Sequence, residues 1–267
     1  MSAQLMDGKT LAAQKKAAIR AEVERLARTP GLAVVLVGEN PASQIYVRGK
    51  ARDCEECGIR CMDFRLPAQM TESELLTLIA ELNGRADVDG ILVQLPLPEG
   101  IRERRVLEAI APEKDVDAFH PENVGRLVQG QARYLPCTPA GVMELLRAAG
   151  VDPAGRRAVI VGRSNIVGKP MALLLLQADA TVTVCHSRTP DLADECRRAD
   201  ILISAVGRRG LITADMIKPG AAVVDVAMNR DEDGKLCGDV DFAAACAVAA
   251  HITPVPGGVG PMTRAML

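Results

Sequence analysis

Aromatic residues are scarce in this chain of 267 residues, which contains no Trp, two Tyr and three Phe. The hydrophobic core must therefore be aliphatic, and any exposed aromatic side chain becomes a candidate for ligand contact. Tyr46 is such a candidate.

The chain also lacks a strong net charge and long hydrophobic runs. Its formal net charge is −2 and the basic residues are spread along the sequence, which argues against a nucleic-acid or membrane surface as the main partner. No apolar run reaches the ~18 residues of a membrane span, and the N-terminal residues lack the apolar segment of a signal peptide. We therefore expect a cytoplasmic protein whose partner is a small molecule, with no nucleic acid and no membrane.

Eight cysteines are present, and most of them lie inside periodic segments. In a reducing compartment such residues usually serve as small buried hydrophobic side chains, so we expect unpaired thiols. Cys54, Cys57 and Cys61 could suggest a zinc or iron–sulfur site, but zinc would require a fourth ligand nearby. Because the first two continue the helix that carries Tyr46, we expect no metal.

Short apolar runs that alternate with helical patterns predict the fold class. At this length about two domains are expected, and 48% apolar with 25% charged residues is the balance of an ordinary globular protein. Several runs are apolar on both faces, which suits strands of a parallel sheet covered by helices on either side. We predict a doubly wound α/β fold with strands near 32–37, 60–65, 90–93, 158–161, 181–185, 201–204 and 222–226.

A strand followed by G-R-S-N-I-V-G-K-P forms a candidate anion site. Gly162 stands at the end of the strand and Gly168 at the start of a helix, so the backbone could approach a pyrophosphate and the helix N-terminus would face it. The spacing departs from G-x-G-x-x-G, and a tight turn without a ligand is the alternative reading. Arg163 lies in the same turn, where it could bind phosphate or be simply solvated.

The end of the next strand favours NADP over NAD. NAD-specific sheets carry an acidic residue about 20 positions after the glycine turn, where it binds the ribose 2′-hydroxyl. Here the strand ends in C-H-S-R-T, and Ser187 and Arg188 offer a hydroxyl and a guanidinium that suit a 2′-phosphate.

In the N-terminal half, Tyr46 and Lys50 lie one helical turn apart, after a helix start at Asn40. A lysine carries protons near neutral pH only if its pKa falls from ~10.4 towards ~7–8. The pattern Y-x-x-x-K also occurs in short-chain dehydrogenases, but there it follows the glycine turn, whereas here it precedes it. A solvated helix face is the alternative reading.

Two further polar groups follow a buried strand. Gln94 stands at the carboxyl end of G-I-L-V, where ligands bind in open α/β sheets. The loop P-E-K-D-V-D contains Asp115 and Asp117, which could bind a metal, cap a helix or accept hydrogen bonds from nitrogens of a heterocycle. We prefer the heterocycle, because a Ca²⁺ loop would need more oxygen ligands at regular spacing.

Seven motifs, in the same order along the chain, resemble those of the bifunctional methylenetetrahydrofolate dehydrogenase/methenyltetrahydrofolate cyclohydrolase family. They are V-G-E-N-P-A-S-Q-I-Y-V-R-G-K, G-I-L-V-Q-L-P-L-P, P-E-K-D-V-D, P-C-T-P, G-R-S-N-I-V-G-K-P, C-H-S-R-T and P-V-P-G-G-V-G-P-M-T. The resemblance implies an N-terminal catalytic folate-binding domain over 1–138 and a C-terminal Rossmann-like NADP-binding domain over 139–253, with a cleft between them. It also implies that residues 254–267 return to the catalytic domain and that the protein is a homodimer.

The resemblance assigns roles to individual residues. Lys50 is the central acid/base group, Gln94 holds it, Tyr46 packs against the folate ring system, and Asp117 anchors the pterin with Asp115. Further folate contacts are implied for Pro256, Gly257 and Gly258. The implied NADP contacts are Gly162, Arg163, Ser164, Gly168, Ser187 and Met228, to which charge adds Arg188.

The implied activity is oxidation of 5,10-methylenetetrahydrofolate with NADP, followed by hydrolysis of the methenyl product to 10-formyltetrahydrofolate. A monofunctional dehydrogenase of the same family is the nearest alternative. A second alternative is a dehydrogenase that acts on shikimate or an amino acid. A third is a regulatory protein without catalytic activity, which binds NADP or holds a metal through its cysteines. The sequence departs from the family pattern at Ala118, where glycine usually follows D-V-D, and at Ala227 and Met228, where V-D-V-A-M-N-R replaces V-D-V-G-I-N-R.

Overall fold

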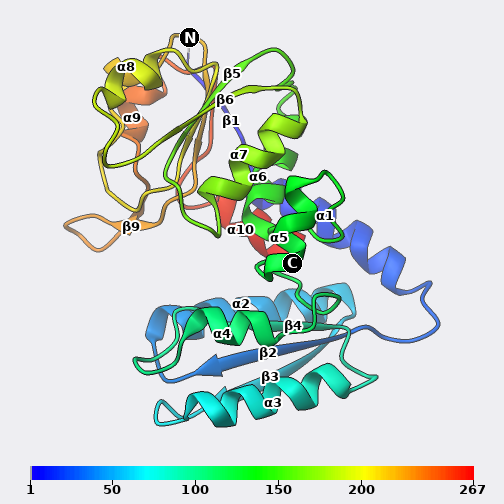
Figure 1. Ribbon diagram of the computed structural model, residues 1–267. Helices are drawn as coiled ribbons and strands as arrows, with labels where there is room; N and C mark the ends of the chain where they lie inside the picture. Colours follow the sequence, from blue (N-terminus) through cyan, green and yellow to red (C-terminus); the bar gives the residue numbers. More distant parts are fainter. Residues whose placement is uncertain (1) are drawn as a thin grey trace. The chain divides into compact units, whose positions relative to one another are not determined.

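The computed structural model describes residues 2–267, apart from the side chain of Ala42, and these residues form two units (Figure 1). The first unit contains Gln14–Leu135 together with Leu267. The second unit contains the residues up to Ala13 together with Pro136–Met266. The division follows Leu135 and groups the C-terminal residues up to Met266 with the second unit. The domain bounds 1–138 and 139–253, with 254–267 returning to the catalytic domain, stay a prediction.

The first unit is built on a parallel three-stranded sheet in the order β3-β2-β4. Its strands are β2 (Gly31–Val37), β3 (Arg60–Leu66) and β4 (Gly90–Val93). Its helices are α2 (Pro41–Cys57), α3 (Glu72–Gly84), α4 (Glu103–Ala109) and α5 (Pro121–Val128), preceded by α1 (Gly8–Val23), which begins in the second unit.

Residues of β2 alternate between the two faces of this sheet, as a period of two requires. Ala33 and Val35 pack with buried residues of α3 and α4, whereas Leu32 and Val34 pack with Val47 of α2. Because helices cover both faces, β2 is buried along its whole length, and this explains why its sequence is apolar at every position.

Local sequence fixes both ends of α2, the helix that carries Tyr46 and Lys50. The side chain of Asn40 accepts a backbone N–H of the first turn, and Pro41 occupies the first helical position. The helix ends at Gly58, whose φ of 75° lies in the left-handed region that favours glycine. The predicted helix start at Asn40 is therefore confirmed.

The second unit contains a parallel six-stranded sheet in the order β1-β11-β8-β7-β5-β6. Its strands are β1 (Gln4–Leu5), β5 (Arg157–Val161), β6 (Thr181–Cys185), β7 (Ile201–Ser204), β8 (Ala222–Asp225) and β11 (His251–Ile252). A separate antiparallel hairpin is formed by β9 (Asn229–Arg230) and β10 (Leu236–Cys237). The helices are α6 (Cys137–Ala148), α7 (Gly168–Gln177), α8 (Leu192–Arg197), the 3-10 helix η1 (Ala214–Met216), α9 (Phe242–Ala245) and α10 (Val259–Met266).

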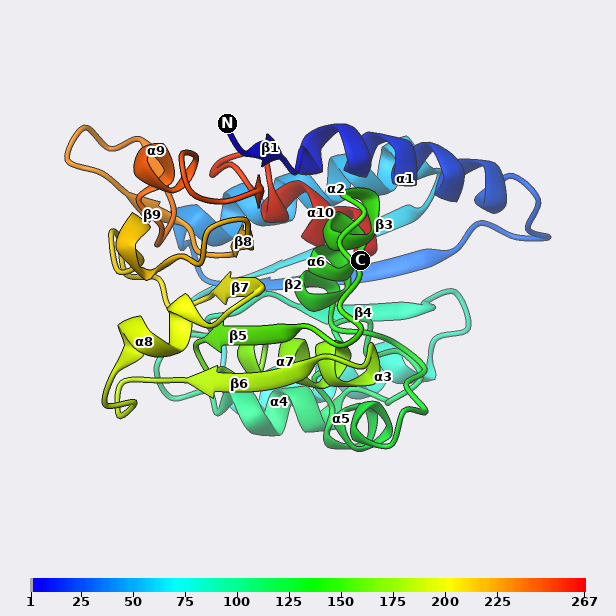
Figure 2. The same ribbon diagram turned by 90° about the horizontal axis from the view of Figure 1, so that it is seen from above.

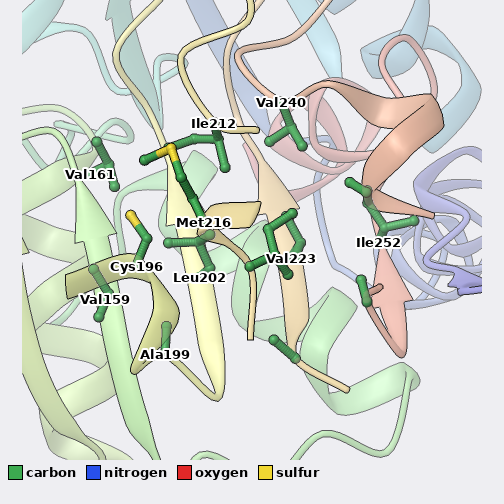
Figure 3. Packing of buried hydrophobic residues seen from close by; sticks show 14 of the residues in the cluster. Val159, Val161, Cys196, Ala199, Leu202, Ile212, Met216, Val223, Val240 and Ile252 are labelled. Atoms are coloured by element: carbon green, nitrogen blue, oxygen red, sulfur yellow. The ribbon is translucent and has the colours of Figure 1, made fainter. Parts of the chain in front are cut away.

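The core of the second unit is aliphatic with buried cysteines (Figure 3). Val159, Leu202 and Val223 come from three adjacent strands, and Cys196 of α8 and Met216 of η1 belong to the same cluster. The expectation of an aliphatic core is therefore confirmed.

The strand order places β5 between β6 and β7, which lie on opposite sides of it (Figure 2). Because the chain passes from β5 to β6 and then crosses to β7, the sheet has a topological switch point between β5 and β7. Ligands of open α/β sheets bind at the carboxyl ends of the strands at such a point. The predicted α/β class is confirmed, and none of the described helices is long and apolar enough to cross a membrane.

Candidate active site

Lys50 and Gln94 meet in the first unit. Nζ of Lys50 on α2 donates a hydrogen bond to Oε1 of Gln94 at 3.2 Å. Gln94 directly follows β4, and its Nε2 donates to the carbonyl oxygen of Leu95 at 2.7 Å. The second bond orients the amide, because its nitrogen is engaged and its oxygen accepts from the lysine.

Asp115 is buried and fixes the local backbone. Its Oδ2 accepts the backbone N–H of His120 and the Nδ2 group of Asn123, each at 2.8 Å. Asp115 also forms a parallel bridge to Ile91 of β4. The carboxylate therefore ties the edge of the sheet to the start of α5, and the turn between them contains Asp117.

Asp117 lies within electrostatic reach of Lys50. Burial raises the pKa of the Asp117 carboxyl, the positive charge of Lys50 opposes this rise, and the negative charge of Asp115 adds to it. The structure thus brings together an amine, an amide oxygen and a carboxyl group whose protonation is sensitive to its surroundings. Such a set can bind a polar heterocycle and transfer protons.

Tyr46 lies one helical turn before Lys50 and is 37% exposed, so the ring is accessible from solvent. Ala118, which follows Asp117, is buried and has a φ of 58°. This left-handed conformation explains why glycine suits the position, and an alanine there costs roughly 1–2 kcal/mol of strain.

The glycine turn after β5 admits no side chains at its two key positions. Gly162 has a φ of 122°, and a Cβ atom there would lie 2.5 Å from the carbonyl oxygen of Ala205. A Cβ atom on Gly168 would lie 2.2 Å from the carbonyl oxygen of Gly162. The turn between β5 and α7 is therefore tight, and α7 begins at Gly168 as predicted.

Ser164 shapes this turn from within. Its Oγ accepts the backbone N–H groups of Val167 at 3.1 Å and Gly168 at 3.3 Å. Arg163 and Ser164 are both accessible at the surface of the turn. The hydroxyl thus stabilises the N-terminus of α7, and the arginine can be reached by an anionic ligand.

The turn after β6 lies beside the glycine turn. The backbone N–H of Gly162 donates to the carbonyl oxygen of Cys185 at 2.9 Å. His186 organises the turn after β6, because its Nδ1 accepts the N–H of Arg188 at 3.1 Å and its own N–H donates to Thr189. Ser187 and Arg188 are exposed at the tip of this turn. The residues predicted to bind the phosphates of NADP therefore lie at the carboxyl ends of the neighbouring strands β5 and β6.

The loop after β8 combines an exposed Met228 with a buried Ala227. Burial raises the pKa of Asp225, the last residue of β8, to about 6. Its Oδ1 accepts the N–H of Ala227 at 3.1 Å and its Oδ2 accepts the N–H of Val240 at 2.8 Å. Asp225 therefore holds the backbone on which Met228 is presented.

The P-V-P-G-G segment belongs to the second unit, whereas Lys50 and Gln94 belong to the first. Pro256 is exposed, and Gly257 has a φ of 110°. A Cβ atom on Gly8 would lie 1.8 Å from the carbonyl oxygen of Gly258, which is buried, so the start of α1 packs directly on this loop.

All eight cysteines are free thiols, as predicted. A hydrogen bond with Cys61, together with burial, raises the pKa of the Cys54 thiol. Across residues 2–267, no group of three or more His, Cys, Asp or Glu residues is arranged to hold a metal ion.

Sequence reasoning missed Asp239, a fully buried carboxylate in the second unit. Its only signal in the sequence is the G-D-V-D run that follows β10. Aspartate is ordinarily a surface residue, and nothing in its local pattern identifies the distant loop that it binds.

A parallel sheet with a glycine turn at its switch point, joined to a second α/β unit, defines a two-domain dinucleotide-binding protein of the dehydrogenase type. The chain belongs to the tetrahydrofolate dehydrogenase/cyclohydrolase family. The model of the family's catalytic domain matches residues 6–117, and the model of its NAD(P)-binding domain matches residues 136–267.

Relatives match the chain over nearly its whole length. The bifunctional protein FolD of Magnetococcus marinus is 60% identical over 269 residues, which cover 99% of this chain and 94% of the relative. The crystal structure of the bifunctional FolD enzyme from Campylobacter jejuni is 52% identical with a TM-score of 0.98, covering 99% of this chain and 95% of that one. The Trypanosoma brucei enzyme, complexed with NADP cofactor and inhibitor, is 43% identical with a TM-score of 0.95, covering 100% and 95%.

Shikimate 5-dehydrogenase from Thermus thermophilus shares only 20% identity and a TM-score of 0.53, covering 89% of this chain and 90% of that one. This likeness shows a common fold alone.

Proposed function

We propose that the protein oxidises 5,10-methylenetetrahydrofolate to 5,10-methenyltetrahydrofolate with NADP and hydrolyses the methenyl product to 10-formyltetrahydrofolate. The observation that carries the proposal is the contact between Lys50 and Gln94, with Asp117 close enough to respond to the charge of Lys50. The bifunctional relatives favour both activities over the monofunctional alternative.

The hydrolysis is assigned to Lys50. Water adds to the methenyl carbon, the bond between that carbon and N5 of the folate breaks, and the carbon keeps the oxygen as a formyl group on N10. Of the two protons of the water, one goes to N5 and one is released. A neutral Lys50 takes a proton from the attacking water and can return it at the ring nitrogen, while Gln94 keeps Nζ in place.

Folate binding is assigned to groups with complementary chemistry. The half-buried carboxylate of Asp117 accepts hydrogen bonds from the nitrogens of the pterin, and the exposed ring of Tyr46 offers a flat surface for stacking. Asp115 supports the turn of Asp117 through its own hydrogen bonds. Contacts of Pro256, Gly257 and Gly258 with folate rest on the family motif alone.

NADP is assigned to the second unit, whose glycine turn fits a dinucleotide. A Cβ atom at Gly162 or Gly168 would strike backbone, so only glycines leave the surface of the turn open for a pyrophosphate. Arg163 and Ser164 lie in this turn, and Ser187 and Arg188 lie beside it for the 2′-phosphate. Met228 is a candidate contact on the loop after β8. These residues would hold the NADP, and the bound cofactor would supply the acceptor for the hydride of the one-carbon bridge.

We also infer from the family resemblance that the protein acts as a cytoplasmic homodimer. Light scattering on the purified chain would test the dimer, and a mass equal to one chain would contradict it.

The role of Lys50 is tested by Lys50→Met. We expect this variant to lose hydrolysis of added methenyltetrahydrofolate and to retain part of the reduction of NADP, because hydride transfer needs orientation of the substrate but no lysine proton. Lys235→Met, which replaces a 76% exposed side chain on the hairpin, is the matched control and should keep both activities. Intact hydrolysis in Lys50→Met would remove the assignment.

A further inference from the structure

Asp239 is fully buried, and its carboxylate accepts five hydrogen bonds. Oδ2 accepts from Oγ of Ser204 at 2.9 Å and from the backbone N–H groups of Val206 at 2.9 Å and Gly207 at 3.3 Å. Oδ1 accepts from the N–H of Arg208 at 2.6 Å and from Nδ2 of Asn229 at 3.0 Å. This number of donors offsets the cost of burying a charge.

The donors lie at or just beyond the carboxyl ends of β7 and β8. Ser204 ends β7, and residues 206–208 form the loop after it. Asn229 is the first residue of β9 and directly follows Met228, the last residue of the loop after β8. Three consecutive backbone N–H groups, those of residues 206–208, are directed at one carboxylate, and this shared acceptor fixes the path of the β7 loop.

A second carboxylate holds Asp239 in place. Oδ2 of Asp225 accepts the N–H of Val240, and a Cβ atom on Gly238 would lie 1.9 Å from the same oxygen. Only glycine at 238 therefore allows this segment to approach β8 so closely. The segment 238–240 is thus held against β8, and the carboxylate of Asp239 links the loop after β7 to Asn229, which directly follows the loop after β8.

The β7 loop lies next to the glycine turn at the switch point. The N–H of Ala205 donates to the carbonyl oxygen of Val161 at 2.9 Å, and the carbonyl oxygen of Ala205 is the group that excludes a side chain at Gly162. A dinucleotide that lies across this point contacts both loops.

The two sides of β5 serve different halves of the cofactor. Ser187 and Arg188 follow β6, on one side of β5, and they are suited to the 2′-phosphate of the adenosine half. The loops after β7 and β8 lie on the other side, where the nicotinamide half must extend.

We propose that Asp239 is a positioning residue that shapes the binding surface for the nicotinamide half of NADP by holding the loops after β7 and β8. The proposal rests on the proposed function. According to this proposal, the orientation of the nicotinamide depends on Asp239. Recognition of the 2′-phosphate and hydrolysis of the methenyl product do not depend on it.

The test uses the full chain with Asp239→Asn, which replaces one acceptor oxygen by an amide nitrogen that faces other donors. Because a misplacement of about 1 Å costs on the order of 100-fold in rate, we expect the kcat for NADP reduction to fall by about 10- to 100-fold. Hydrolysis of added methenyltetrahydrofolate and the ratio of kcat/KM with NADP to that with NAD should each stay within about twofold of wild type.

A readout without cofactor accompanies the kinetics. Amide hydrogen exchange of residues 206–208 in the ligand-free protein should become at least about 10-fold faster in Asp239→Asn, because the carboxylate that accepts their N–H groups loses one acceptor oxygen. Asp241→Asn is the matched control. The carboxylate of Asp241 accepts a hydrogen bond from the N–H of Ala244 in α9, and this bond involves neither the loop after β7 nor the loop after β8. The control variant should change neither the exchange nor the rates.

Unchanged NADP reduction in a folded Asp239→Asn variant, or an equal fall in reduction and hydrolysis, would overturn the proposal. If that variant does not fold, Asn229→Ala removes one donor only, and it must still lower reduction relative to hydrolysis. Wild-type protein that performs neither reaction would instead refute the proposed function, while the exchange measurement would still report whether Asp239 holds the loop.

Discussion

We expect Gly162→Ala to destabilise the second unit and to weaken NADP binding. An alanine at a φ of 122° would place its Cβ atom 2.5 Å from the carbonyl oxygen of Ala205. An L-residue at positive φ costs roughly 1–2 kcal/mol, and overpacking costs roughly 1–3 kcal/mol. The free energy of unfolding should therefore fall by about 2–5 kcal/mol.

Gly155→Ala is the control for backbone strain alone. Gly155 has a φ of 71° in the same unit, and no atom lies within 4 Å of the position that its Cβ would occupy. It should lose only the strain contribution of roughly 1–2 kcal/mol and keep its affinity for the cofactor. Urea denaturation measures both variants, and titration with fluorescent NADPH measures binding. Equal stability losses in the two variants, with NADPH binding retained in both, would refute the steric argument at the glycine turn.

Three further predictions concern a phosphate clamp, a helix end and pH. Arg188→Ala should raise the KM for NADP by about 10-fold or more and leave the KM for NAD unchanged, because a charge-assisted hydrogen bond to phosphate contributes roughly 1.5–3 kcal/mol. Parallel steady-state kinetics with the two cofactors would measure both KM values. Lys114→Met should lower the free energy of unfolding by roughly 1.5–3 kcal/mol in urea denaturation. Its ammonium group donates to the carbonyl oxygens of Leu82, Asn83 and Arg85 at the end of α3, which the variant leaves without this partner. The carboxyl of Asp225, with its pKa raised to about 6, binds a proton more tightly in the folded than in the unfolded chain. The contribution of Asp225 to the free energy of unfolding is therefore largest below about pH 4 and declines by roughly 3 kcal/mol as the pH rises past 6. Asp225→Asn should remove that part of the pH dependence, which urea denaturation at several pH values would measure.

The sheet strands with strong apolar patterns were predictable from the sequence. Runs such as those of β2 and β5 are buried on both faces, so their composition alone indicates parallel strands beneath helices. The strands β1, β9, β10 and β11 were not predicted, because each is two residues long and gains its pairing from other segments. The glycine turn followed from a motif at a strand end, whereas the contact of Lys50 with Gln94 was implied by the family resemblance.

The roles of the buried carboxylates were harder to anticipate. Asp115 belongs to a motif that drew attention as a ligand site, yet its carboxylate accepts bonds from His120 and Asn123 and thereby holds a turn. The G-D-V-D run around Asp239 does not reveal its partners, since its five donors lie 10 to 35 residues away along the chain. Sequence indicates residue types near a site, whereas the residues that support the site depend on tertiary contacts.

The most direct test of the central claim follows absorbance after the protein is mixed with 5,10-methylenetetrahydrofolate and either NADP or NAD, with reduced cofactor and methenyl product monitored separately. We predict that the cofactor is reduced faster with NADP and that the methenyl product does not accumulate, because the same protein hydrolyses it. Accumulation of the methenyl product would contradict the hydrolysis, and no reduction with either cofactor would contradict the whole account.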